Sequence, residues 1–175
     1  MASTPVLTQE FFERDTVTVA RELMGQKLCR RLSTGEILRW ELCEVEAYDG
    51  GQDLACHACR GKTPRNAVMF GSAGVFYVYL CYGVHWLLNI VTGPADFPAA
   101  VLIRGAGPKI GPGRLTKAMQ IDQSLNGLPA TQESGLWVEQ GSVLQESQIE
   151  RTPRIGIGYA GEPWLSAPYR FVRKL

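Results

Sequence analysis

The sequence contains no internal repeat, no low-complexity segment and no obvious linker between domains. These absences argue against a repeat array, and nothing marks a boundary between separately folded units. The 175 residues are enough for one domain with a substantial buried core. We therefore expect residues 1–175 to form a single domain.

Signals for export and for membrane insertion are also missing. The opening stretch "MASTPVLTQEFFERD" has no basic start followed by an apolar core. The strongly apolar residues 75–91 are slightly too few for a membrane span and include Gly83, His85 and Asn89, so a buried strand is favoured. The five cysteines are an odd number, which predicts free thiols in a reducing compartment. We expect a bacterial cytoplasmic protein that does not enter a membrane.

Histidine is scarce, and the sequence lacks the two closely spaced pairs of Cys or His that a structural zinc site usually has. Cys56, His57 and Cys59 lie close together, but no second Cys or His pair at similar spacing completes a tetrahedral zinc site. The Gly-Lys-Thr sequence that ends at Thr63 lacks the earlier glycine of a phosphate-binding loop. We therefore expect no metal and no cofactor. A zinc protein organised by these three residues is the alternative, which elemental analysis decides.

Positive charge is clustered although the formal net charge is only +1. The clusters are Arg60, Lys62 and Arg65; Arg104, Lys109, Arg114 and Lys117; and Arg151, Arg154, Arg170, Arg173 and Lys174. Either these groups converge on one face that meets a polyanion, or they lie in solvated loops. Charge alone favours the solvated loops.

Hydrophobic periodicity and turn residues predict a mixed α+β fold. Residues 8–24 should form a short helical turn and then an amphipathic helix that Gly25 ends. A hairpin is expected from residues 26–34 and 36–48, followed by a long irregular segment at 49–74. Further strands are expected at 75–82, 84–91, 99–104, 136–139 and 169–172, with a short helix at 112–121.

Three features fit a catalytic or nucleic-acid-binding site. Glu46 and Tyr48 are two residues apart on one strand and should share a face. Tyr82 adjoins Gly83 at a hairpin tip, where Asn, Asp and Gly are the usual residues. Arg104 ends a buried strand. Each residue alone is explained by packing or by a solvated position, but together they suit a protein that inserts a side chain into a duplex and stacks a displaced base.

Several motifs occur in a fixed order along the chain. They are "EVEAYDGGQDLACHACRGKTPRN", "MFGSAGVFYVYLCYGVHWLLNIV", "VLIR", "GPGRLTKAMQID", "RIGIGYAGE" and "YRFVR". In this order, from about Leu7 to Arg173, the chain resembles the alkyladenine, or 3-methyladenine, DNA glycosylase family. The resemblance implies a compact domain around a curved antiparallel sheet, with a protruding β-hairpin and few short helices.

The resemblance implies roles for three residues in a hydrolysis reaction. Glu46 would be the general base that activates water, and Arg104 and the main-chain carbonyl of Ile155 would hold that water. The bond broken would be the N-glycosidic bond of an alkylated or deaminated purine in double-stranded DNA. Candidate lesions are 3-methyladenine, hypoxanthine, 7-methylguanine and ethenoadenine. No lysine matches a Schiff-base nucleophile, so a monofunctional glycosylase that leaves an abasic site is expected. We also expect the protein to be a monomer.

The resemblance also implies how the damaged base and the duplex are bound. Tyr48, His57 and Tyr79 would stack on the flipped base, and the backbone amide of His57 would donate to its edge. Asn89 would exclude the exocyclic amine of guanine, and Tyr82 would fill the gap left in the duplex. DNA contacts are implied for three more residues: Thr63, Arg65 and Asn66.

Some positions depart from the family pattern. Gly107 stands where an acidic residue is frequent, and Tyr159 stands where histidine is common. Val84 and His85, after the expected wedge, also differ from the usual neighbours. These differences bear on the damage spectrum and on affinity. The alternative function is a damaged-DNA-binding module without catalysis, for which Glu46 would be dispensable.

Overall fold

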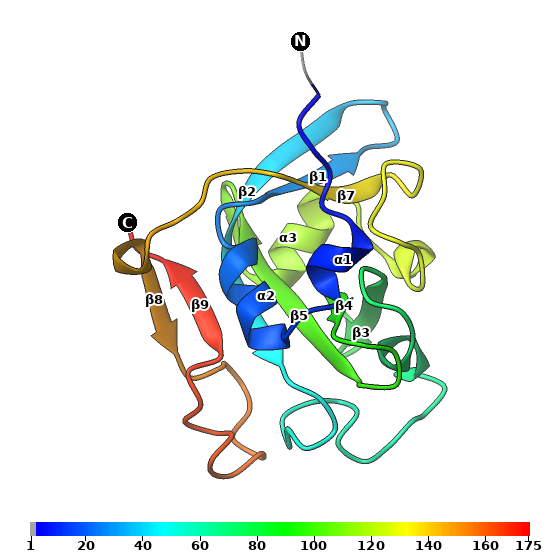
Figure 1. Cartoon of the computed structure of the whole chain (residues 1–175). Coiled ribbons are helices and arrows are strands. Elements are labelled where there is room, and N and C mark those ends of the chain that lie inside the picture. Colours follow the sequence, from blue (N-terminus) through cyan, green and yellow to red (C-terminus); the bar gives the residue numbers. More distant parts are fainter. Residues whose placement is uncertain (1–2) are drawn as a thin grey trace.

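The structure of the chain, a computed structural model that describes residues 3–175, is organised around one antiparallel sheet (Figure 1). The main path of the sheet has the order β3-β4-β5-β2-β1-β7, while β6 pairs with β5, and β9 pairs with both β2 and β8. The strands formed by these residues are β1 (Lys27–Arg31), β2 (Ile37–Tyr48), β3 (Phe76–Cys81), β4 (His85–Thr92), β5 (Ala99–Ala106), β6 (Lys109–Ile110), β7 (Leu136–Glu139), β8 (Ile149–Thr152) and β9 (Arg170–Arg173).

The long strand β2 connects the parts of the sheet. Its residues 37–41 pair with β1, and its later residues pair with β5. Residues 44–46 also pair with β9. A register shift between Leu42 and Val45 separates the two halves, and such irregularities increase local twist. Glu46 pairs with Leu102 of β5 and with Arg170 of β9, so both strands lie beside it.

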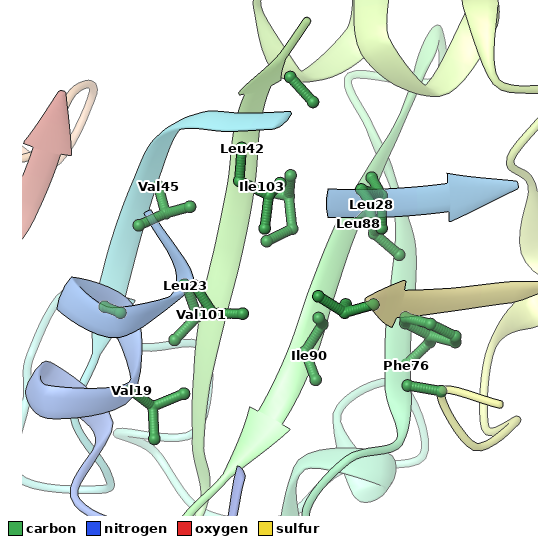
Figure 2. Packing of buried hydrophobic residues seen from close by; sticks show 14 of the residues in the cluster. Val19, Leu23, Leu28, Leu42, Val45, Phe76, Leu88, Ile90, Val101 and Ile103 are labelled. Atoms are coloured by element: carbon green, nitrogen blue, oxygen red, sulfur yellow. The ribbon is translucent and has the colours of Figure 1, made fainter. Parts of the chain in front are cut away.

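Two short helices near the N-terminus pack on one face of the sheet. They are α1 (Gln9–Phe12) and α2 (Thr16–Leu23), and the carboxylate of Asp15 caps α2 by accepting a backbone N–H at 2.9 Å. Val19 and Leu23 of α2 are fully buried against the sheet (Figure 2). Burial of each such side chain contributes about 1.5–3 kcal/mol. The other helical segments are α3 (Pro112–Ala118), η1 (Ala67–Phe70), η2 (Gln123–Leu125) and η3 (Glu146–Gln148).

The two faces of the sheet bury different clusters. Phe76, Ile90 and Val101 belong to the main core, which α2 covers (Figure 2). Their chain neighbours Tyr77 and Val91 belong to a second cluster, because successive strand residues point to opposite faces. Part of the irregular segment 49–74 closes this second cluster with Cys56, Ala58 and Met69. The segment therefore folds over the face of the sheet opposite the main core.

The predicted α+β fold class is confirmed, with a curved antiparallel sheet and few short helices. The predicted strand at 136–139 coincides with β7, and most other boundaries shift by only a few residues. The sequence pattern did not predict β6, which has two residues, or β8, where "IERT" shows no apolar alternation. Within residues 3–175, no helix has the length and apolar character needed to cross a membrane.

Candidate active site

A cavity of about 920 Å³ opens on the second face of the sheet. Its walls come from β2, the irregular segment, the β3–β4 hairpin, β5, the start of α3 and residues 155–159. Aromatic rings line much of it: Tyr48, His57, Tyr77, Tyr79, Tyr82 and Tyr159. Positive charge comes from Arg65, Arg104, Arg114 and Arg170. A concave site with aromatic walls and a few convergent charged groups is typical of ligand binding.

Glu46 lies near the end of β2 and is fully buried beside this cavity. Val45 and Ala47 point into the main core, so Glu46 and Tyr48 point to the cavity side. The Glu46 Oε2 accepts a hydrogen bond from the Tyr48 hydroxyl at 2.8 Å, and the Glu46 Oε1 accepts one from the Ile155 N–H at 2.9 Å. The prediction that Glu46 and Tyr48 share a face is confirmed. Since a carboxylate has about four acceptor positions, Glu46 keeps the capacity to bind a water molecule.

Arg104 on β5 lies between two carboxylates. Its Nε is 2.9 Å from Oε1 of Glu44 and 3.5 Å from Oε1 of Glu46. Arg170 on β9 donates to the same Glu44 oxygen at 2.8 Å. Sequence reasoning missed Glu44 and Arg170, although the Glu-x-Glu spacing in β2 places both carboxylates on one face. The four side chains balance two negative against two positive charges next to the cavity.

Ile155 reaches the site from the segment that follows β8. Its side chain lines the cavity and is 49% exposed, while its backbone N–H is bound to Glu46. Ile155 therefore contacts the expected general base directly through its backbone. The role implied for the Ile155 carbonyl, which is to hold water, stays a prediction.

Tyr48 connects the cavity wall to the buried carboxylate. Burial raises the pKa of Tyr48 well above 10, and the charge of Glu46 and the hydrogen bond to it act in the same direction. The phenol therefore stays protonated near neutral pH and donates to Glu46. One side chain thus supplies both an aromatic surface to the cavity and a hydrogen bond to the carboxylate.

His57 and Tyr79 form a second aromatic wall. Their ring centroids are 4.6 Å apart at 64°, and His57 Nδ1 lies 3.2 Å from the Tyr77 hydroxyl. Burial, with a smaller effect from Arg65, lowers the pKa of His57 below 6.5, so its ring is neutral at pH 7. Burial raises the pKa of Tyr77 to about 12 and also raises that of Tyr79. The structure brings Tyr48, His57 and Tyr79 to one cavity; their stacking on a base stays a prediction.

Asn89 is buried at the cavity wall on β4. It is 4% exposed, and its Nδ2 donates to the Tyr77 carbonyl at 3.1 Å across the β3–β4 pair. This bond fixes the side-chain amide within the sheet. A rigid polar group at the wall of an aromatic cavity is suited to rejecting a ligand by shape, which is compatible with the role implied for Asn89.

The three residues expected to contact DNA differ in their exposure. Thr63 and Arg65 are exposed, and the Arg65 guanidinium lies 5.4 Å from the centroid of the Tyr79 ring. Asn66 is 3% exposed, and its Nδ2 donates to the carbonyls of His57 and Gly61 at 3.2 and 3.0 Å. The Asn66 side chain therefore holds the segment that carries His57. DNA contact by these residues stays a prediction.

Tyr82 occupies the tip of the β3–β4 hairpin. Its side chain is 96% exposed, and its φ of +51° lies in the left-handed region that favours glycine. Tyr82 and Gly83 form a two-residue turn with positive φ at both positions, closed by a hydrogen bond from Val84 N–H to the Cys81 carbonyl. A large exposed ring on a strained residue has no packing function here, and strain of this kind is associated with functional sites.

The third cluster of positive charge does not form a free basic surface. Each of its four arginines pairs with an acid: Arg151 with Glu146, Arg154 with Asp53, Arg170 with Glu44 and Arg173 with Glu41. Arg154 lies neither on a basic surface nor in a solvated loop, the two alternatives expected for this cluster, because its side chain is fully buried. Spacing along the sequence did not reveal these pairs, since each joins residues that the tertiary fold or a turn brings together.

In the part of the chain that the structure describes, the cysteines do not belong to a cluster of metal-binding side chains. Among residues 3–175, no group of three or more His, Cys, Asp or Glu side chains is placed to hold a metal ion. All five cysteines are free thiols. Burial raises the pKa of Cys56 to about 12, so its thiol is protonated at neutral pH and is a poor nucleophile.

Comparison with known proteins identifies the family. The family model for methylpurine-DNA glycosylase (MPG) matches residues 10–111 and 109–174. A protein of Methanocella arvoryzae is 42% identical over 190 residues, covering 97% of this chain and 93% of that protein. A protein of Sodalis glossinidius is 46% identical over 164 residues, covering 90% of this chain and 92% of that protein. A protein of Legionella pneumophila (strain Paris) is 43% identical over 175 residues, covering 96% and 94%.

Each of these relatives carries the name "Putative 3-methyladenine DNA glycosylase". The match to the family model extends over most of the chain, from α1 to the C-terminal strand β9. The predicted resemblance is therefore confirmed. The chain belongs to the methylpurine-DNA glycosylase family of DNA glycosylases.

Proposed function

We propose that this protein flips an alkylated or deaminated purine out of duplex DNA and hydrolyses its N-glycosidic bond. One observation carries the proposal: the fully buried carboxylate of Glu46 is hydrogen-bonded by Tyr48, whose ring lines an aromatic cavity. A base in contact with that ring would have its sugar near the carboxylate. Family membership supports DNA as the substrate.

The reaction needs a water molecule and one carboxylate. The bond between C1′ of the deoxyribose and the purine nitrogen breaks, and its electron pair leaves with the base. Positive charge develops on the sugar, as in the hydrolysis of other glycosides. Water bonds to C1′ and gives a proton to Glu46, which leaves a free base and an abasic site. Arg104 at 3.5 Å and the Ile155 backbone are suited to orienting that water beside Glu46.

The cavity suits a purine that carries positive charge. An alkylated purine such as 3-methyladenine is cationic in DNA and leaves as a neutral base, so it needs little help from an acid. Contact between a cation and a neutral aromatic face is worth about 0.5–2 kcal/mol. Tyr48, His57 and Tyr79 supply such faces, since His57 is neutral at pH 7. Hypoxanthine and ethenoadenine require protonation from another source.

The remaining roles concern the duplex. Extrusion of a base costs a few kcal/mol, and less at a damaged or mispaired position. Tyr82, exposed at the hairpin tip, would enter the gap, and Asn89 would reject guanine. The backbone amide of His57 would donate to the flipped base. Phosphate contacts would come from exposed basic residues such as Arg65.

An excision panel tests this proposal. Purified protein is incubated with duplex DNA treated with a methylating agent, and with duplexes that contain hypoxanthine or ethenoadenine; an undamaged duplex is the control. We expect release of free 3-methyladenine, and strand breaks only after alkali treatment, because no covalent lyase step is involved. Tight binding to damaged duplex without release of any base would instead establish the non-catalytic binding module.

A further inference from the structure

The cavity has a buried ion pair behind it that the hydrolysis steps above do not use. Asp53 and Arg154 are both fully buried, with Nη1 to Oδ2 at 2.5 Å and Nη2 to Oδ1 at 2.9 Å. Neither residue lines the cavity, but the pair joins the irregular segment that carries His57 to the segment that carries Ile155. A bidentate pair of this kind fixes the relative orientation of two segments as well as their distance.

Arg154 touches the part of β2 that holds the catalytic carboxylate. Its Nη1 donates to the Ala47 carbonyl at 2.9 Å, between Glu46 and Tyr48 in the chain. Its guanidinium lies 4.8 Å from the centroid of the Tyr48 ring and 5.2 Å from that of the Tyr169 ring. Tyr48 lines the cavity and the fully buried Arg154 does not, so the guanidinium contacts the ring from outside the cavity.

Asp53 organises the start of the irregular segment. Besides both arginine nitrogens, its carboxylate accepts the backbone N–H groups of Asp49 and Ala55, each at 3.0 Å. Ala55 lies two residues before His57, and its carbonyl accepts a hydrogen bond from the Tyr159 hydroxyl at 3.0 Å. The single carboxylate therefore connects the end of β2, the approach to His57 and the chain beside Ile155.

Stability alone does not explain this arrangement. A buried ion pair is on average no more stabilising than apolar side chains of similar volume. In addition, the buried Nε of Arg154 has no hydrogen-bond partner among residues 3–175, which is a further cost. The pair does, however, contact the segments that carry Tyr48, His57 and Ile155, so it can fix their relative positions.

We propose that the Asp53–Arg154 ion pair is a positioning device for base excision. It fixes the positions of the Tyr48 ring, the His57 segment and the Ile155 backbone relative to Glu46. The proposal rests on the proposed function, because these positions matter only if a base and a water are bound there. Misplacement of reacting groups by about 1 Å costs about 100-fold in rate, so loss of the pair should slow the chemical step.

The test removes both charges together, so that no buried charge is left unpaired. The double variant Asp53→Asn/Arg154→Met is compared with Arg39→Met/Glu139→Gln. That control neutralises an ion pair of 3.1 Å at the other end of β2, where Glu139 is 4% exposed. The measurements are the single-turnover rate of base release from methylated duplex DNA, the Kd for undamaged duplex and the thermal unfolding midpoint.

We expect the single-turnover rate of the Asp53/Arg154 double variant to fall about 10- to 100-fold. Its Kd and unfolding midpoint should stay close to those of the control. A rate within twofold of wild type in the folded variant would overturn the proposal. If this variant does not fold, Arg154→Lys decides, because Lys keeps the charge but not the planar fork. Arg154→Lys should fold and lose at least about tenfold in rate, and a wild-type rate would overturn the proposal.

The two proposals fail in different ways. If the wild-type protein releases no base from any damaged duplex, the proposed function fails, and the positioning role fails with it. If wild type releases base and the Asp53/Arg154 variants do so equally fast, the positioning role alone fails.

Discussion

The Tyr48 hydroxyl donates a 2.8 Å hydrogen bond to Glu46, two residues earlier on the same strand. The same tyrosine ring borders the aromatic cavity. Because the pKa of Tyr48 is raised well above 10, this hydrogen bond persists across the neutral pH range. Under the proposed function, recognition of a base at the ring and orientation of the carboxylate would therefore be coupled through one side chain.

Tyr48→Phe separates these two functions. The variant keeps the ring but leaves Glu46 without one of its two hydrogen bonds. A hydrogen bond to a charged group contributes about 1.5–3 kcal/mol, so we expect the free energy of unfolding to fall by about that amount. The single-turnover excision rate should fall about 10- to 100-fold, since Glu46 is less well held. Tyr169→Phe is the matched control, because its ring also packs on Arg154. Equal rates for the two variants would contradict the coupling.

Tyr82→Gly should weaken function without weakening the fold. Glycine relieves the positive φ of +51°, and the 96% exposed tyrosine ring has almost no packing to lose. We expect the free energy of unfolding in urea to stay the same or to rise by up to about 1 kcal/mol. Excision should fall at least about tenfold, because no ring fills the duplex. Val84→Ala, at the same tip, is the control, and unchanged excision by Tyr82→Gly would exclude a wedge.

The salt dependence of DNA binding should distinguish free from paired arginines. Arg114 is exposed at the cavity rim and forms no ion pair with any residue that the structure describes, whereas Arg151 is paired with Glu146. We expect Arg114→Ala to reduce the slope of log K against log salt by about 1, as for a lost phosphate contact. Arg151→Ala should leave the slope unchanged. The reverse pattern would place the DNA on another face.

The His57 ring should make stability depend on pH. Its pKa is lowered in the folded state, so the unfolded chain takes up the proton at higher pH. The associated stability is fully present above about pH 6.5 and is lost as the pH falls below that value. His57→Gln should therefore lose less stability between pH 7 and pH 5 than wild type, as measured by urea denaturation. An equal loss in both proteins would show that His57 does not titrate as described.

Local sequence pattern was sufficient for most strands of the sheet and for two features of the site. The period-two alternation in "ELCEVEAY" correctly placed Glu46 and Tyr48 on one face. The glycine after Tyr82 correctly placed that residue at a turn. Both features depend only on neighbours in the chain.

Long-range pairing could not be predicted in this way. Asp53 and Arg154 are about a hundred residues apart, and their ion pair exists only because β9 brings the C-terminal segment beside β2. Arg154 was therefore grouped with surface charges in the sequence, although it is fully buried. Asn66 similarly resembles an exposed loop residue until its hydrogen bonds to the chain near His57 are known.

The most direct test of the account is the single-turnover excision rate of Glu46→Gln. Glutamine keeps the shape of Glu46 but cannot take a proton from water, and general-base catalysis typically contributes 10²–10⁴-fold. We predict a fall of at least about 100-fold with DNA affinity within a few-fold of wild type. Glu139→Gln, which changes another buried glutamate outside the cavity, should keep the wild-type rate. Near-wild-type excision by Glu46→Gln would contradict the central claim that this carboxylate activates the water.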